Sequence, residues 1–281
     1  MNNTNVNVNQ VHQESQNTSN NQQSQNSSLL NSSLNMNNAS NISIAKISGN
    51  TNINADGKLT VHSTDNTNLS SVLRTVVVSG VQAFGMIRDF ADVKSKNSAV
   101  IENVNGTFNV GSLDIVSDSK EMESYARANI VAVTGAGAGK TNSNGAYMRS
   151  EMTAGINSAT GLTINNKGAT TILAGVNADN WANATNFKAE SKISSTSVSI
   201  GQLFGTALAF SENNAKVITN LNAKEHNANS LNMTGFLNET GITTFSDTSV
   251  QLLKGSGISA ETDFQSALIM NVAGVNNFAN N

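Results

Sequence analysis

Apolar and polar residues alternate along most of the chain after residue 41. Ile53, Ala55, Leu59 and Val61 share one parity, whereas Asn, Asp, Lys, Thr and His residues take the other. This alternation predicts a half-buried β-strand, because successive side chains of a strand point to opposite faces. Four further pairs repeat the pattern: Ile42 and Ile44, Leu113 and Ile115, Leu162 and Ile164, and Leu231 and Met233.

The first 41 residues have a different character. They form a tract of Asn, Gln and Ser with scattered Val and Leu, and they show no helical stripe. Such a segment buries too little apolar surface to offset the entropy lost on ordering. We therefore divide the chain into 1–41, expected to be disordered or to act as an assembly arm, and 42–281, expected to be a repetitive β-domain.

Short segments recur along the β-domain. Residues 57–63, GKLTVHS, return at 111–117 as GSLDIVS, a shift of 111 − 57 = 54. Residues 71–84, SVLRTVVVSGVQAF, return at 265–278 as QSALIMNVAGVNNF, a shift of 265 − 71 = 194, and a weaker copy lies at 124–139. Recurrence of a strand-like unit about every fifty residues is typical of repeat architectures, in which each unit buries its apolar face against its neighbours.

These patterns predict an all-β chain of four to five irregular units, folded as a β-solenoid or parallel β-helix. The alternative is a compact β-sandwich built from hairpins, and Asn105-Gly106 between two apolar runs is a strong hairpin signal. The continuous apolar run 71–84 predicts a strand covered on both faces. A helix over 81–93 is a less favoured alternative.

The apolar runs are rich in β-branched residues, nearly uncharged and free of proline, which is typical of a buried core or of an assembling face. We expect eleven residues of these runs to form the core and assembly surface: Val76, Val77, Val78, Val81, Phe84, Ile130, Val131, Val133, Val272, Val275 and Phe278.

Composition narrows the class of protein. The 281 residues include no proline and no cysteine, only 12% are charged, and the net charge is −3. The absence of cysteine excludes a disulfide framework, a thiolate nucleophile and a cysteine-based zinc site. The net charge argues against a general nucleic-acid binder. No apolar run reaches the roughly 18–20 residues of a membrane helix, so we expect no membrane insertion. The first residues carry no secretory signal, so an exported protein would be a mature form or a fragment, or leave by another route.

Three groups of residues are candidates for chemistry. Residues 134–141, TGAGAGKT, resemble the end of a phosphate-binding loop, but Thr134 stands where the first Gly belongs and no helix-forming sequence follows Lys140. His12, His62 and His226 show no ligand spacing, and we expect them to be solvated. Asp89, Asp92, Asp114 and Asp118 form an acidic strip if neighbouring units align, and Arg74 and Arg127 then lie close together.

A carbohydrate-active enzyme using Asp114 or Asp118 with Arg127 is therefore one alternative function. Trp181 is a candidate for stacking on a sugar, although a lone Trp is more often a packing residue. We expect no catalytic residue, cofactor or metal site.

The paired units at 57–84 and 111–139 resemble large bacterial surface exoproteins of the filamentous-haemagglutinin and leukotoxin-like adhesin type. Residues 126–144 and 265–281 are also similar to the repeats of functional-amyloid fibre subunits. Both resemblances imply a secreted structural or adhesive protein of the bacterial surface. Its partner would be itself, in a head-to-tail or strand-ladder homopolymer, or a cell-surface glycan or protein.

Overall fold

A computed structural model of the chain describes residues 6–15, 18–26, 30–79, 82–135, 137–199, 202–250 and 253–278. Every regular element within these residues is a β-strand. All the strand pairs are parallel except the contact between β8 (Ala169–Asn177) and β9 (Asn180–Ala184). Parallel pairing excludes the hairpin-built β-sandwich and leaves an all-β, parallel-sheet architecture.

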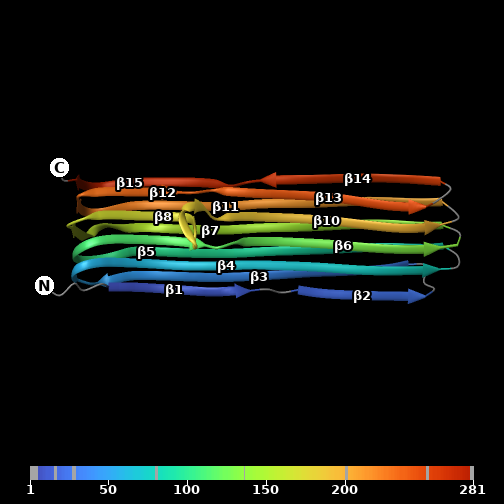
Figure 1. Cartoon of the computed structure of the whole chain (residues 1–281), viewed down its shortest axis with the longest axis horizontal. Helices are drawn as coiled ribbons and strands as arrows, with labels where there is room; N and C mark the ends of the chain where they lie inside the picture. The colour runs from blue at the N-terminus through green and yellow to red at the C-terminus, as the bar shows by residue number, and fades with distance from the viewer. Residues whose placement is uncertain are drawn as a thin grey trace.

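The strands run in two opposite directions along the long axis of the molecule (Figure 1). The forward layer holds β1 (Val6–Ser15), β2 (Thr18–Asn26), β4 (Ile53–Ser79), β6 (Met122–Thr134), β8, β10 (Asn186–Ser199), β12 (Ser230–Gly235) and β13 (Asn238–Val250). The return layer holds β3 (Leu30–Asn50), β14 (Leu253–Phe264) and β15 (Ala267–Phe278). Three long strands begin in the return layer and bend into the forward layer: β5 (Gln82–Ser119), β7 (Gly137–Asn166) and β11 (Gln202–Ala228).

Residues of successive turns pair in columns that cross the whole stack. One forward column consists of Val6, Leu59, Leu113, Thr170 and Leu231. One return column consists of Ile47, Ile101, Ile156, Leu221 and Val272. Each column has five members, so the described residues make five turns. The first two shifts of the forward column, 59 − 6 = 53 and 113 − 59 = 54, agree with the repeat length predicted from the sequence.

The two layers join at a corner near one end of the strands. Gly49 and Asn103 lie at this corner with positive φ angles of 82° and 52°. Asn105 and Gly106 also lie here, where the chain passes from the return layer to the forward layer. The prediction of a β-hairpin was wrong, because Asn105 pairs with Asn50 of the previous turn and Gly106 pairs with Leu162 of the next. The reversal connects two layers, and the arms on either side of it do not hydrogen-bond to each other as a hairpin.

The space between the layers is apolar near the corner. The largest fully buried side chains include Phe108, Leu59, Leu113, Ile101 and Ile115. Leu162 and Ile164 are fully buried as well, as their alternation predicts. Each such side chain contributes about 1.5–3 kcal/mol through the apolar area it removes from water.

Farther from the corner, small polar side chains share the interior with buried apolar residues such as Leu73, Phe187 and Ile193. Ser43 of the return layer hydrogen-bonds to the Ser63 hydroxyl of the forward layer over 2.9 Å. Asn97 donates to the backbone oxygens of Ser63 and Asp118 at 3.1 and 2.6 Å. Ladders of Ser, Thr and Asn therefore fill the space between the layers where large apolar side chains are scarce.

The alternation of Ile42 and Ile44 was assigned to the wrong face. Both side chains are exposed, Ile42 by 61%, whereas Ser43 between them is fully buried. The inward side chain, Ser43, faces the Ser63 hydroxyl across a narrow gap. A serine fits this gap, whereas an isoleucine is too large for it.

That residues 1–41 are disordered or act as an assembly arm stays a prediction, and the described parts of this tract pair with later strands. β1 and β2 pair with β4, and β3 pairs with β5. A polar tract lacks the apolar surface to order alone, but an ordered neighbouring strand offers it a complete row of backbone donors and acceptors. The alternation of Val6 and Val8 places them in the columns of Leu59 and Val61.

The longest sequence match does not mark equivalent positions. Val78 lies in the forward layer beside Val133, whereas Val272 lies in the return layer beside Leu221. The weaker copy at 124–139 is the structural neighbour of 71–84, with Ser71 beside Ala126. The true shift there is 126 − 71 = 55, so Arg127 pairs with Val72 and not with Arg74.

Candidate functional site

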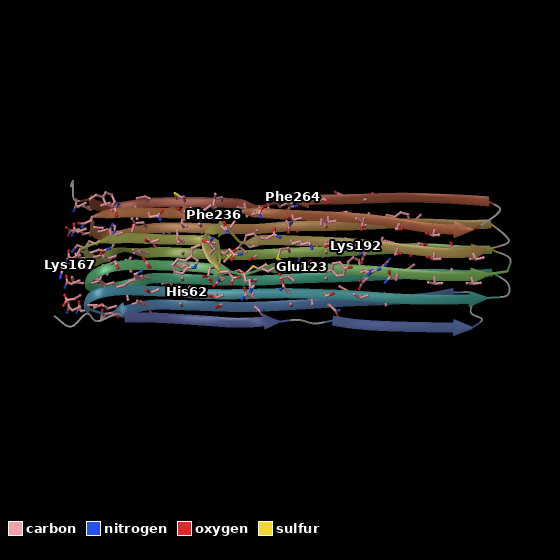
Figure 2. The ribbon with its side chains drawn as sticks, viewed as in Figure 1. His62, Glu123, Lys167, Lys192, Phe236 and Phe264 are labelled. Carbon is pink, nitrogen blue, oxygen red and sulfur yellow. The ribbon has the colours of Figure 1, made fainter. Side chains whose placement is uncertain are left out.

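The last described turn leaves the apolar columns of the interior open to solvent. Leu221 is fully buried, but Val272, its partner one turn later, is 55% exposed. Phe264, Leu268 and Met270 are also about half exposed, and they pair with the inward-facing Asn213, Val217 and Thr219. Figure 2 shows Phe264 on the outermost return strand. Because no further turn covers these side chains in the described chain, the core ends in an open apolar face.

We call this surface the open face and define it by Phe264, Leu268, Met270, Val272 and Phe278. It coincides with a sheet edge. Within the described residues, β14 and β15 pair only with β11, and β13 pairs only with β10. An edge of this kind presents free backbone donors and acceptors beside apolar side chains, which favours the addition of another strand.

The structure places the predicted core residues on different surfaces. Val272 and Phe278 belong to the open face, so they are not core in the single chain. Val131 is partly exposed and Val133 is 42% exposed, because they point outward from β6 while Ala128 and Ala132 point inward. In a continuous apolar run, the sequence does not show which side chains point inward. Val275 is exposed at the corner, in the outward column of Glu225. Val81 lies outside the described residues, as do the side chains of Val76, Val77, Val78, Phe84 and Ile130.

A ladder of asparagine side chains runs along the outside of the corner. Its members are Asn54, Asn109, Asn165, Asn227 and Asn277, one on each of five consecutive passes. Each Nδ2 donates to the Oδ1 of the preceding member, at 2.6, 2.8, 3.0 and 2.8 Å. The ladder therefore has a direction, with its donors toward the N-terminal end of the stack and its acceptors toward the open face.

The sequence carries a signal for this ladder that the analysis of apolar periodicity missed. Each of the first three members directly follows a large apolar residue: Ile53, Phe108 and Ile164. These positions differ by 108 − 53 = 55 and 164 − 108 = 56, close to the 54-residue repeat of the neighbouring segment.

A second cluster lies on the outer face of the forward layer, under an arch that contains β9 and crosses the sheet (Figure 1). Trp181 of the arch donates its indole N–H to Asp118 Oδ2 over 2.9 Å. Thr64 Oγ1 donates to Asp118 Oδ1, and His62 Nε2 lies 2.7 Å from Asp118 Oδ2. The Trp181 ring meets the His62 ring edge-on, with centroids 5.8 Å apart. The arch thus ties together β4, β5 and its own turn.

The other acidic residues of the predicted strip do not converge. Asp114 pairs with Lys58 over 2.7 Å, and Asp92 pairs with Arg149 over 3.1 Å. Asp89 is buried and accepts from Ser71 and from the backbone N–H of Arg127. Asp114 and Asp118 are four residues apart on β5, about 13 Å at the rise of a strand, which exceeds the spacing of a glycosidase pair.

The glycine-rich segment 134–141 was a candidate for phosphate binding. Gly139 and Lys140 lie within β7, paired on both sides with β5 and β11, so their backbone amides belong to a ladder and not to a phosphate-binding loop.

The prediction of a solvated His226 was wrong. His226 is fully buried, its Nε2 lies 2.8 Å from Thr170 Oγ1, and burial lowers its pKa although Asn276 acts in the opposite direction.

Aromatic side chains form a row on the outer face of the return layer. Tyr147 lies between Phe90 and Phe210, with ring centroids 6.3 and 5.5 Å apart. Arg149 lies over the Tyr147 ring at 5.1 Å, and burial raises the pKa of the Tyr147 hydroxyl. Gly145 occupies the column between the two Phe residues and leaves room for the tyrosine ring.

No family model, no curated protein and no solved structure matches this chain. Among the described residues, none of the groupings of His, Asp and Glu has three members placed to hold a metal ion. The described part of the chain also contains no helix long and apolar enough to cross a membrane.

Proposed function

We propose that this chain is a β-solenoid subunit of a self-assembling, extracellular fibre or adhesin of the bacterial surface, without catalytic activity. The observation that carries the proposal is the open face, where columns buried on every earlier turn become exposed on the last. Leu221 and Val272 are the clearest pair, because they occupy one column and a further described turn covers only Leu221.

A stack of parallel turns can always accept another turn at its end. Each turn satisfies the backbone groups and covers the apolar side chains of the one before it, so the last turn is left with both unsatisfied. Natural repeat proteins close such ends with a polar capping unit. The last described turn exposes Phe264, Leu268, Met270, Val272 and Phe278, and such an apolar face favours the addition of another turn from a second molecule.

Secretion and surface location are parts of the same proposal. They rest on the resemblance to surface exoproteins and amyloid-type fibre subunits and on a chain without cysteine, which needs no particular redox environment. Expression of a tagged full-length chain, followed by protease treatment of intact cells, tests this location. Loss of the tag signal without lysis supports it, whereas full protection contradicts it.

Electron microscopy of the purified chain, before and after prolonged incubation, tests assembly. We expect filaments. Leu268→Lys/Val272→Lys places two charges on the open face without burying them in the single chain, and it should keep the fold and abolish the filaments. The matched control, Asn105→Lys/Asn157→Lys, adds the same charge at exposed corner positions and should assemble normally. Equal assembly of both variants, or none by the unaltered chain, would refute the proposal.

A second candidate function is binding of a cell-surface glycan, and the aromatic row of Phe90, Tyr147 and Phe210 favours it. Aromatic faces beside charged groups are common in sugar-binding sites, and Arg149 with Asp92 supplies such groups here. Tyr147→Ala should then abolish retention on a glycan array without affecting filaments. Unchanged retention, or no retention by the unaltered chain, would exclude this role of the row.

A further inference from the structure

The first and last described strands meet the stack at nearly the same position around a turn. Asn277 belongs to the column of Asn54, and Asn54 precedes Leu59 by five residues. Leu59 is the partner of Val6, where β1 begins. In the register of the internal turns, the forward-layer position that follows Asn277 is therefore the column of Leu59 and Val6.

This relationship creates matching steps at the two ends of the stack. At the C-terminal end, β14 and β15 form the outermost return strands, and the next place in the forward layer, beside β12 and β13, is vacant within the described chain. At the N-terminal end, β1 and β2 are the outermost forward strands and β3 is the outermost return strand. A second copy whose β1 begins where β15 ends would continue both layers without a shift in register.

We infer that the partner of the open face is the turn formed by β1, β2 and β3 of a second copy of this chain, held in the register of the internal turns. This inference rests on the proposed assembly and adds to it the partner surface and its alignment. Continuing the columns sets Leu231 beside Val6, Ala267 beside Ile42, and Val272 beside Ile47 of the second copy.

The side chains of β3 suit this register. Outward-facing Ile42 and Ile44, both exposed in the single chain, would lie beside Ala267 and Ile269 and form a continuous apolar strip. On the inward side, Phe264 would lie beside Ala39, so a large side chain meets a small one. Lys46 would lie beside Asn271, and Asp263 beside Asn38, so neither pair sets like charges together.

The direction of the Asn ladder agrees with a head-to-tail contact. Each member accepts a hydrogen bond from the next turn through Oδ1, and Asn277 presents the same atom toward the open face. Two open faces in contact would oppose acceptor to acceptor and would pair parallel strands in antiparallel fashion. Head-to-tail contacts of this kind are heterologous and propagate as filaments when the rotation between copies does not close a ring.

Disulfide cross-linking tests the register, because the chain contains no cysteine of its own. Ile42 and Ala267 lie in one column four strand spacings apart, about 19 Å in a single molecule, which is far beyond the reach of a disulfide. In the inferred junction they are neighbours at about 5 Å. Ile42→Cys/Ala267→Cys should therefore give a ladder of covalent oligomers under mild oxidation, resolved on a non-reducing gel.

The matched control is Ile44→Cys/Ala267→Cys, in which one cysteine is displaced by two residues along β3. We expect at least ten-fold less cross-linking from this pair. Ala267→Cys alone reports contact between two open faces, which would stop at covalent dimers.

Electron microscopy of the same samples separates this inference from the proposed function. Filaments with a ladder from the matched pair and little from the control support the register. Filaments without that ladder, with equal ladders from both pairs, or with abundant dimers from Ala267→Cys overturn the register and leave self-assembly standing. Samples without filaments or ladders overturn both.

Discussion

Asn165 donates a hydrogen bond to Asn109 over 2.8 Å, although 56 positions separate the two residues in the chain. Asn227 donates to Asn165 in the same way on the next turn. These contacts join successive turns on the outside of the corner, where the backbone ladders bend between layers. They give the stack a direction as well as a fixed register.

The ladder can be tested at its centre. Asn165→Asp keeps the size of the side chain but replaces the donor to Asn109 with a second acceptor, so two oxygens face each other. We expect a loss of about 1–2 kcal/mol in the free energy of unfolding, measured by urea denaturation. Asn157→Asp, exposed on the same strand, is the control and should change stability by less than about 0.5 kcal/mol. Equal effects would contradict the role of the ladder.

Substitution of Gly175 tests its close contact with the backbone of Phe236. Gly175 has a φ of +71°, and a Cβ at this position would lie 2.0 Å from the backbone oxygen of Phe236. Gly49 has a φ of +82° but open space around it. Gly49→Ala should cost about 1–2 kcal/mol for its conformation alone, and Gly175→Ala should cost several kcal/mol more. Thermal unfolding of both variants measures the difference, and equal costs would show that the contact with Phe236 is absent.

Trp181 tests the arch. Trp181→Phe preserves a ring against His62 but removes the N–H that bonds the buried Asp118 carboxylate. We expect a loss of about 1–3 kcal/mol, concentrated in faster amide hydrogen exchange over residues 177–185. Asn183→Ala, exposed on the same arch, should leave that exchange unchanged. If Trp181→Phe also leaves it unchanged, the arch is held by other contacts.

His226 makes the last turn sensitive to acid. Burial lowers the pKa of His226 below 6.5 in the folded chain. As the pH falls, His226 is therefore protonated more readily when the last described turn is detached than when it is packed. Stability from this burial is complete above about pH 6.5 and is lost progressively as the pH falls below it, because the unfolded state then binds more protons. Hydrogen exchange over residues 267–278 at pH 7.5 and 5.5, corrected for intrinsic rates, measures the loss. His226→Gln should remove the pH dependence, and a variant that retains it would assign the effect elsewhere.

Periodicity predicted the all-β class because the apolar residues of several short segments alternate with one parity. Leu59, Leu113 and Leu162 are all fully buried, and the 54-residue shift between the first two is their true register. The rule failed at Ile42 and Ile44, where the interior narrows and a serine is the inward residue. It also failed for Val131 and Val133, since a continuous apolar run does not show which parity points inward.

Features that depend on contacts between turns were harder to predict. The match between Val78 and Val272 pairs residues of opposite layers, because short apolar β-sequences resemble one another whichever layer they occupy. The burial of His226 depends on Phe278, which lies 52 residues later and meets its ring at 6.0 Å. The pairing of β1 and β2 with β4 likewise joins residues about fifty positions apart.

Helical reconstruction of the filaments by electron cryomicroscopy tests the central claim most directly. Five turns at about 4.8 Å each predict an axial rise of about 24 Å per subunit, with strands perpendicular to the filament axis. We expect this rise and one continuous pair of layers across each junction. Filaments whose strands run along the axis, or a chain that stays monomeric under all conditions, would contradict this expectation.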